Sequence, residues 1–338
     1  MNLKNKLITW RDERDLLRRT PMQETRDGQF SFVNWYKTVP DEEFLVRIIR
    51  SWFPGNHKKI RFYSVFGPTK AVNEDFDGIR IFYNGENIQQ RVIHDPNAGR
   101  PEKTAAWEYR ASRYREDVQW DQFDLVLGYD CSPAKENFLY FPLWFARYYQ
   151  PEKKGKDVYQ RFTEMEEKRH TAAFEDRTGA CVISSHDFMG SRAKVCDALV
   201  QAVPITYAGK WRNNTTALWD NYQNDKQRFL SQFRFNICPE NMDASGYTTE
   251  KIFDAYASGC IPLYMGSLGK PAEGILNPRS YILFDPEKTN KRQAQLVRDL
   301  AGDCRMFMEN SIFLPGAFSV MDDLYRQRLQ SRLHEILA

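Results

Sequence analysis

Short apolar runs alternate with helical patterns through the second half of the chain, and this order restricts the fold more than any other feature of the sequence. Strands are expected at 180–184, 203–208, 233–238, 261–264 and 281–284. Helical patterns lie between them at 192–202, 219–232 and 249–258, and continue from 289 onward. This order predicts a parallel, doubly wound sheet covered by helices on both faces. Ligands of such sheets bind at the carboxyl ends of the strands, so a site is expected in the loops that follow them.

The first half repeats this order less regularly. Strand patterns occur at 30–36, 60–66, 79–83 and 123–128, and residues 41–52 carry apolar side chains at helical spacing. A polar, charged stretch at 150–178 separates the two halves. A chain of 338 residues suits about two domains of roughly 150 residues each, so we expect two α/β domains. The tail predicts one amphipathic helix. Its apolar residues recur at helical spacing: Met321, Tyr325, Leu329, Leu333 and Ile336.

Composition excludes several classes of protein. Lys and Arg number 48 against 45 Asp and Glu, a net charge of only +3, so a dedicated nucleic-acid partner is not expected. There is no apolar run of about 20 residues and no apolar core of a secretory signal near the amino terminus. The cysteines never form a C-x-x-C pair, which favours free thiols over disulfides or a zinc site. We therefore expect a soluble, cytoplasmic protein. The cysteines are Cys131, Cys181, Cys196, Cys238, Cys260 and Cys304.

The common catalytic motifs are missing from the sequence. It contains no P-loop, no G-x-G-x-x-G after a strand and no H-E-x-x-H, which disfavours P-loop NTPases, dinucleotide enzymes and zinc proteases. Asp75-Phe76-Asp77 could hold a divalent metal, but the pair precedes a strand and stands directly before Gly78, which favours a turn. Ser185-His186-Asp187 are consecutive residues and cannot form a catalytic triad.

The most informative block is 235–266, FNICPENMDASGYTTEKIFDAYASGCIPLYMG. A strand ends near Glu240, a loop follows, and a helix begins near Thr249 and ends at Gly259. The free N–H groups and the positive dipole end of that helix favour a phosphate, and Lys251 adds a cation. The same dipole would keep Glu250 ionised, which suits a group that faces a developing positive charge better than a proton acceptor. An ordinary capped helix with both side chains in solvent is the alternative that this pattern leaves open.

The block resembles the signature of family 10 glycosyltransferases, the α1,3/4-fucosyltransferases. The transmembrane stem and carboxyl-terminal cysteine pairs of the animal enzymes are not found in this sequence, so a bacterial member is expected. That signature reads F-x-x-x-x-E-N-x-x-x-x-G-Y-x-T-E-K-I-x-x-A-x-x-x-G-x-I-P-I-Y-x-G, and Leu263 replaces its last Ile. Weaker likenesses lie at 66–68 (FGP), 83–87 (YNGEN), 123–129 and around Ser191 and Arg192. The matching residues are Phe235, Glu240, Asn241, Gly246, Tyr247, Thr249, Glu250, Lys251, Ile252, Ala255, Gly259, Ile261, Pro262, Tyr264 and Gly266.

The resemblance implies a GT-B-like fold, in which two Rossmann-like α/β domains face each other across a cleft. Residues 1–165 would bind the acceptor, residues 166–318 would bind GDP-fucose, and residues 319–338 would form the C-terminal amphipathic helix. It also implies inverting transfer of L-fucose from GDP-β-L-fucose to a GlcNAc hydroxyl of an N-acetyllactosamine-type oligosaccharide or glycolipid, giving Lewis-type glycans of lipopolysaccharide or protein glycosylation. No cofactor is required and no protein metal site is implied. Stimulation by Mn²⁺ or Mg²⁺, the α1,3 or α1,4 linkage, type 1 or type 2 acceptors and the oligomeric state stay open.

The resemblance also assigns the site residues. Glu86 is expected to be the general base that deprotonates the acceptor hydroxyl, as inversion requires. Glu250 is expected beside the fucose ring, where it stabilises oxocarbenium character. Arg192 and Lys251 are expected to neutralise the diphosphate. Two further donor-binding candidates carry plainer alternatives: Tyr247 either packs on the nucleotide or sugar or fills the core, and Asn241 either bonds the donor or caps its loop.

Two other readings are kept beside this one. The chain could be another inverting nucleotide-sugar transferase on the same two-domain fold. It could instead be a non-catalytic protein that binds glycans or membranes, with the C-terminal helix docked on lipid. Arg326, Arg328 and Arg332 in that helix would also allow an active enzyme to attach peripherally to the inner face of the membrane.

Overall fold

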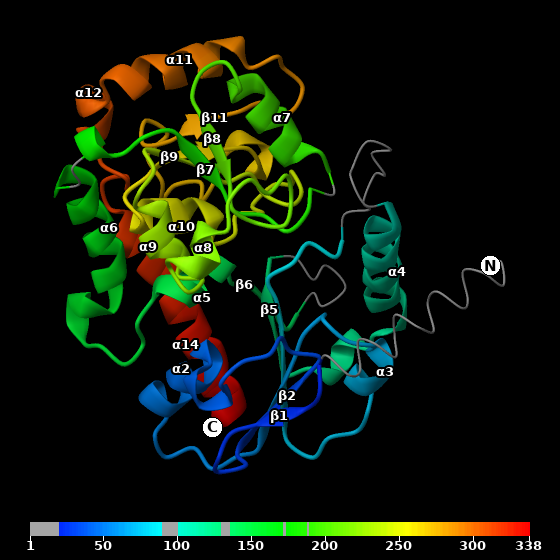
Figure 1. Cartoon of the computed structure of the whole chain (residues 1–338). Coiled ribbons are helices and arrows are strands. Elements are labelled where there is room, and N and C mark those ends of the chain that lie inside the picture. The colour runs from blue at the N-terminus through cyan, green and yellow to red at the C-terminus, as the bar shows by residue number, and fades with distance from the viewer. Residues whose placement is uncertain (1–19, 90–100, 130–135, 172–173, 188) are drawn as a thin grey trace.

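The computed structural model describes residues 20–89, 101–129, 136–171, 174–187 and 189–338. Each half of the chain builds one β-sheet with helices packed on it (Figure 1). A cavity is lined by residues of both halves. The expected α/β class and the two facing halves are therefore confirmed. The amino-terminal residues considered for a signal sequence, and Cys131, lie outside the described residues. The other five cysteines are free and buried.

The first sheet has six strands in sequential order. Its five later strands pair in parallel, and β1 pairs with β2 antiparallel at the edge. The four expected strands are present, three of them shorter than predicted and β4 one residue longer, while β1 and β6 were not predicted. The strands are β1 Gln23–Glu24, β2 Phe30–Val33, β3 Ile60–Tyr63, β4 Ile79–Asn84, β5 Leu125–Gly128 and β6 Phe138–Tyr140.

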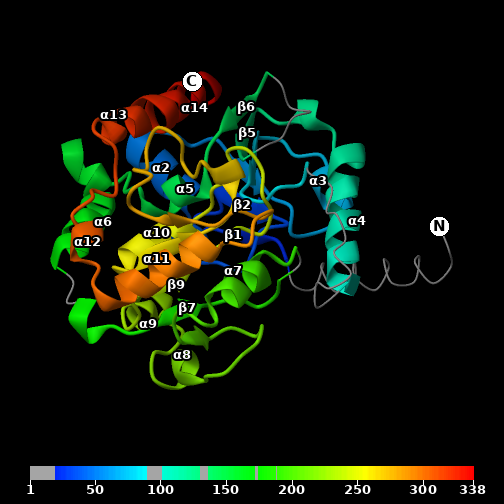
Figure 2. The same cartoon turned by 90° about the horizontal axis from the view of Figure 1, so that it is seen from above.

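Helices cover both faces of this sheet because its strands are apolar on both sides. Phe62 and Ile81 pack with α2 (Phe44–Trp52) on one face, and Tyr63 and Phe82 pack with α4 (Pro101–Asp117) on the other. Figure 2 shows α2 and α5 on one side of the strands and α3 and α4 on the other. The helix predicted at 41–52 is confirmed as a 3₁₀ turn followed by α2. The remaining elements here are η1 Pro40–Glu42, α3 Thr69–Val72, η2 Trp120–Gln122 and α5 Leu143–Tyr148.

The second sheet has five parallel strands in the order β11-β10-β9-β7-β8. All five strands predicted for this half are confirmed. The chain order reverses between β7 and β9, so the loops after these two strands diverge and leave a crevice at their carboxyl ends. The strands are β7 Ala180–Val182, β8 Ile205–Tyr207, β9 Phe235–Ile237, β10 Ile261–Tyr264 and β11 Ile282–Leu283.

One helix of the second half differs from the prediction. The single helix expected at 219–232 is wrong, because Gln223 and Asn224 take left-handed backbone angles, with φ of 51° and 64°. Asp225 then begins a new helix, and its side chain accepts the N–H of Arg228 at 3.0 Å. The helices of this half are α6 Gln160–Thr171, α7 Ser191–Leu199, α8 Ala217–Asp220, α9 Lys226–Leu230, α10 Lys251–Ala257, α11 Lys291–Gly302 and α12 Arg305–Met308, with the 3₁₀ turns η3 Gly155–Tyr159, η4 Phe174–Asp176 and η5 Ser267–Gly269.

Two helical segments join the halves. The predicted boundary at 165/166 falls inside α6, where Phe162 packs on Trp144 of the first half and Phe253 of the second. The chain then ends in α13 (Ala317–Met321), a π-helical stretch at Asp322–Gln327 and α14 (Arg328–Leu337). These form the expected C-terminal helix, which returns to lie beside α2 and α5 of the first half (Figure 1).

The apolar face of the C-terminal helix is buried against the protein. Tyr325 packs on Trp144 with ring centroids 5.5 Å apart, and Leu329 and Leu333 are fully buried. Only the polar face, which includes the exposed Arg328, is left for any contact with a membrane surface. Across the part of the chain that the structure describes, no helix combines the length and the apolar character that crossing a bilayer requires.

Candidate active site

A cavity of about 1090 Å³ lies between the two sheets. The loop after β4 reaches it from the first half, and the loops after β7 and β9 and the start of α10 reach it from the second. Five of the six predicted site residues line this one cavity, which is confirmation that they lie together but not of their roles. They are Glu86, Arg192, Asn241, Glu250 and Lys251.

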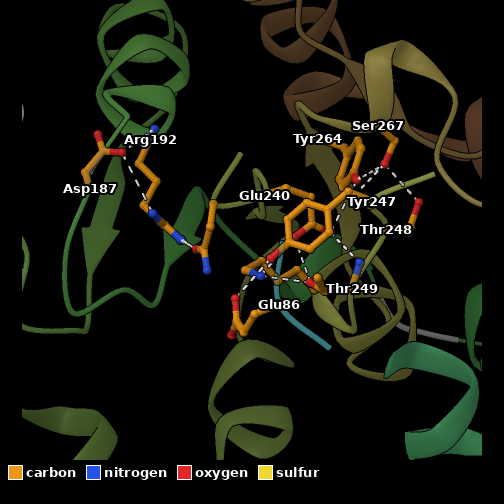
Figure 3. A network of polar contacts seen from close by, with 11 residues as sticks. Glu86, Asp187, Arg192, Glu240, Tyr247, Thr248, Thr249, Tyr264 and Ser267 are labelled. Carbon is orange, nitrogen blue, oxygen red and sulfur yellow. Dashed lines mark hydrogen bonds and ion pairs between the residues drawn. The ribbon is translucent and has the colours of Figure 1, made fainter. Parts of the chain in front are cut away.

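Glu86 follows the carboxyl end of β4 and is held by its neighbours. The Asn84 side chain bonds the backbone of Glu86 twice: its amide donates to Glu86 O at 2.7 Å, and its oxygen accepts Glu86 N–H at 2.9 Å. From the second half, the Tyr247 hydroxyl donates to Glu86 Oε2 at 3.2 Å (Figure 3). The carboxyl group is thus fixed in position by groups from both halves.

The pKa values of Glu86 and Glu250 are shifted in opposite directions. Burial raises the pKa of Glu86, an effect that Lys251 opposes and Glu250 strengthens. Burial would also raise the pKa of Glu250, but Lys251, a backbone hydrogen bond and Arg147 together lower it. Two carboxyl groups with opposite pKa shifts can perform different chemistry at one pH, because one is poised to exchange a proton while the other stays charged.

Lys251 is held by Glu240, a residue that matched the sequence signature but received no predicted role. Glu240 is buried, and its carboxylate accepts bonds from Lys251 Nζ at 2.9 Å, from Thr249 N at 2.7 Å and from Thr249 Oγ1 at 2.7 Å. Lys251 Nζ also donates to Thr249 Oγ1 at 2.8 Å. An ammonium has three donors, so these two bonds leave one for a ligand in the cavity. Burial would lower the pKa of Lys251, but Glu240 and Glu250 raise it, so the cation persists.

These contacts correct the predicted phosphate site at the start of the helix. The N–H group of Thr249 was expected to be free, but it is taken by Glu240. The helix α10 also begins only at Lys251 and has seven residues. The positive charge that faces the cavity here therefore comes from the Lys251 side chain, which is 22% exposed, more than from the helix end.

Arg192 and Asn241 meet where the strand order reverses. Arg192 Nη2 donates to Asn241 Oδ1 at 2.8 Å, which joins the start of α7 to the loop after β9. Asp187 fixes the start of α7 by accepting the N–H groups of Arg192 at 3.1 Å and Ala193 at 2.7 Å. Its nearest oxygen is 3.8 Å from Arg192 Nη1. Burial lowers the pKa of Arg192, and the charge of Asp187 opposes that shift. Asp187 is thus a helix cap and not a triad member.

Tyr247 does not line the cavity, so its position fits the alternative in which it fills the core better than the one in which it packs on the nucleotide or sugar. Its side chain is 1% exposed, and its ring packs on Tyr129 with centroids 4.9 Å apart. Burial and the charge of Glu86 raise its pKa well above the usual value, so the phenol stays protonated and donates a hydrogen bond to Glu86. Tyr247, from the second half of the chain, therefore orients the carboxyl group of Glu86 through this hydrogen bond.

The Asp75-Phe76-Asp77 pair lies at the opposite end of β4 from Glu86. Both aspartates are exposed in the turn between α3 and β4, which confirms the turn interpretation. Within the described ranges, no three His, Cys, Asp or Glu side chains gather into a group that could hold a metal ion. Glu43 and Tyr83 also line the first-half wall of the cavity; Tyr83 is the first residue of the YNGEN segment, but neither residue received a predicted role.

Comparisons with known proteins agree with this architecture. A model described as "Alpha-(1,3)-fucosyltransferase FucT N-terminal domain" matches residues 30–148. A second, "Glycosyltransferase family 10 (fucosyltransferase) C-term", matches residues 173–311. The alpha-(1,3)-fucosyltransferase FucT of Helicobacter pylori is 26% identical over 251 residues, which cover 68% of this chain and 45% of FucT. The chain thus spans about half the length of that relative.

Solved structures show the same GT-B-like fold. A crystal structure of an α1,3-fucosyltransferase with GDP-fucose is similar at a TM-score of 0.52 and 22% identity, over 84% of this chain and 79% of that one. A crystal structure of an α1,3-fucosyltransferase with GDP has a TM-score of 0.56 at 19% identity, over 98% of this chain and 97% of that one. The two family models together span both sheets except β1, and they include the five predicted site residues that line the cavity. The chain belongs to glycosyltransferase family 10, the fucosyltransferases.

Proposed function

We propose that the chain is an inverting fucosyltransferase that moves L-fucose from GDP-β-L-fucose to a GlcNAc hydroxyl of an N-acetyllactosamine-type acceptor, as in Lewis-type glycans. The observation that carries this proposal is the pair Glu86 and Glu250, whose pKa values are shifted in opposite directions in one cavity that Arg192 and Lys251 also line. The names of the relatives support fucose as the sugar, GDP as the carrier and α1,3 as the linkage.

In this proposal Glu86 is the general base. Inversion in one displacement requires a base on the side of the sugar opposite the departing diphosphate. Glu86 comes from the first half, whereas Arg192 and Lys251 come from the second, so base and cations stand on different walls of the cavity. A carboxyl group whose pKa is raised toward neutral is a better proton acceptor for a hydroxyl than an ordinary one.

Glu250, Arg192 and Lys251 would stabilise the charges that develop as the bond to fucose breaks. Glu250 stays ionised and would face the oxocarbenium character of the ring. The diphosphate would take the free N–H of Lys251 and the guanidinium donors of Arg192 that Asn241 leaves unused. Fixed cations in a partly dry cavity stabilise a leaving diphosphate without reorganisation of solvent. We therefore propose that transfer does not require a divalent metal.

Incubation with GDP-fucose and with type 1 or type 2 N-acetyllactosamine tests the proposal, with the linkage read by NMR. The expected product is an α-fucoside, α1,3-linked to GlcNAc. GDP-mannose and UDP-sugars serve as competing donors, and faster transfer from one of them would replace the proposal with another nucleotide-sugar transferase. Binding of glycans or liposomes without any transfer would instead indicate a non-catalytic binding protein.

A further inference from the structure

The first-half wall of the cavity carries a second group of polar and aromatic side chains beside Glu86. Tyr36 follows β2, Glu43 stands at the start of α2, and Tyr83 lies in β4. All three line the cavity, and none has a role in the proposed chemistry. Tyr83 is three positions before Glu86, so this group and the proposed base belong to one continuous surface.

The hydroxyl of Tyr83 is buried and has no hydrogen-bond partner among the described residues. Its side chain is 7% exposed. Burial raises its pKa well above the usual value, and the charges of Tyr36, Glu250, Glu43 and Glu86 strengthen that shift, so the phenol keeps its proton. Buried hydroxyl groups are nearly always hydrogen-bonded in folded proteins. A protonated phenol that lines a cavity without a partner is therefore a donor available to a ligand.

Glu43 is the acceptor that complements this donor. It is 8% exposed, it receives a bond from the Tyr36 hydroxyl at 3.1 Å, and the Thr38 hydroxyl donates to its other oxygen. No Lys or Arg of the described chain forms an ion pair with it. A carboxyl group accepts about four hydrogen bonds, so two neighbouring hydroxyls leave room for ligand hydroxyls. Two fixed oxygens suit a pair of hydroxyls on adjacent carbons.

Tyr36 adds an exposed aromatic surface to the same wall. Its side chain is 44% exposed, while its ring packs on Trp35 at 5.6 Å and on Phe66 at 6.0 Å between centroids. A tyrosine ring that packs on neighbouring rings and is still partly exposed offers a ligand a flat apolar face with a polar hydroxyl at its end. The C–H face of a pyranose ring matches such a surface, whereas its hydroxyls match Glu43 and Tyr83.

We propose that Tyr36, Glu43 and Tyr83 form a subsite that holds one pyranose ring of the acceptor next to Glu86, with Tyr83 donating to and Glu43 accepting from its oxygens. The assignment rests on the proposed transfer to a sugar acceptor. Tyr83 is a positioning residue, because it orders the sugar whose hydroxyl Glu86 receives and takes no part in the bonds that form and break.

Tyr83→Phe tests the subsite by removing the hydroxyl and keeping the ring. The matched control is Tyr63→Phe, because Tyr63 lies on the adjacent strand β3, is fully buried in the cluster on the other face of the sheet and does not line the cavity. Acceptor KM is measured at saturating GDP-fucose, acceptor binding by saturation-transfer NMR, and GDP-fucose affinity by calorimetry. We expect Tyr83→Phe to raise the acceptor KM and Kd about three- to tenfold, the loss of one neutral hydrogen bond, with GDP-fucose affinity unchanged.

Tyr63→Phe should leave all three quantities as in the wild type. An unchanged acceptor KM in Tyr83→Phe, or an equal rise in both variants, overturns the subsite. If the Tyr83 variant fails to fold, as judged by circular dichroism, Glu43→Gln takes its place with the same expected rise and the same overturning result. A wild-type protein that transfers no fucose refutes the proposed function separately, and the NMR comparison with lactosamine alone then still decides whether the subsite binds sugar.

Discussion

Replacing Glu86 with Gln removes the proposed base and keeps the shape of the side chain. The Tyr247 hydroxyl that donates to Glu86 Oε2 at 3.2 Å can donate equally to an amide oxygen, so the local structure should persist. A positioned acid–base group contributes about 10²–10⁴ to a rate. We therefore expect kcat to fall by about 10²–10⁴-fold, or about 3–5 kcal/mol of activation free energy, with unchanged affinity for GDP-fucose.

The pH dependence gives the same change a second signature. Burial raises the pKa of Glu86, so the wild-type kcat/KM should fall as the pH drops through that raised value, because a protonated carboxyl group accepts no proton. Folding stability depends on pH in the opposite direction. The folded state favours the neutral form of Glu86, and this contribution to stability is lost as the pH rises through the pKa of Glu86 in the folded protein. Glu86→Gln should therefore match the wild type in acid and be the more stable protein at about pH 8.

Turnover assays with GDP-fucose and lactosamine measure kcat and kcat/KM, and calorimetry measures the affinity for GDP-fucose. Urea unfolding at two pH values measures the stability. Glu42→Gln is the control, because Glu42 is an exposed carboxyl group on the edge of the same cavity. A Glu86→Gln protein with near wild-type kcat, or one that keeps the acidic fall in kcat/KM, would refute the assignment. Lost GDP-fucose binding would show instead that Glu86 holds the donor.

Three further changes probe the second half. Lys251→Ala should weaken GDP binding at least about tenfold and lower the free energy of unfolding by about 3 kcal/mol, because Glu240 stays buried without its cation. Adding Glu240→Gln should restore stability in urea but not affinity in calorimetry, and unchanged affinity in the single variant would remove Lys251 from the phosphate site. Arg192→Lys should weaken GDP binding about tenfold, because one ammonium group cannot replace a guanidinium that bonds Asn241 and is proposed to bond the diphosphate as well. Equal affinity in the variant would contradict this. Activity should be complete in excess EDTA, and an absolute need for Mn²⁺ would contradict the metal-free proposal.

The strands of the second half could be predicted because a buried parallel strand is apolar at nearly every position. The strand β10, Ile261–Tyr264, lies where it was expected, whereas β6, Phe138–Tyr140, is three residues long and has no period to detect. The helix expected at 219–232 failed for a related reason. Its apolar spacing continues across two short helices, and the left-handed turn at Gln223 and Asn224 does not disturb that spacing.

The sequence predicted which residues meet at the cavity better than it predicted what each contacts. Glu86 and Glu250 were placed by strand ends and by a signature, and both line the cavity. The direction of a side chain is set by packing, so nothing in the signature separated Tyr247, which is buried beneath Glu86, from its cavity-lining neighbours. Glu43 comes from a segment that no local pattern marks, and the YNGEN likeness that begins at Tyr83 assigned a role only to Glu86.

The opposite pKa shifts of Glu86 and Glu250 depend on contact between the two halves of the chain. Glu86 belongs to the first half, but the charged and polar groups that set its pKa after burial, Lys251 and Glu250 foremost, belong to the second. Two tyrosines hold the facing loop in place: Tyr129 donates to Ser245 O at 2.7 Å and Tyr140 donates to Gly246 O at 2.9 Å. Separation of the halves would return Glu86 to water and its pKa to the ordinary value. The raised pKa that suits Glu86 to accept a proton is therefore a property of the closed pair of domains and not of the loop after β4 alone.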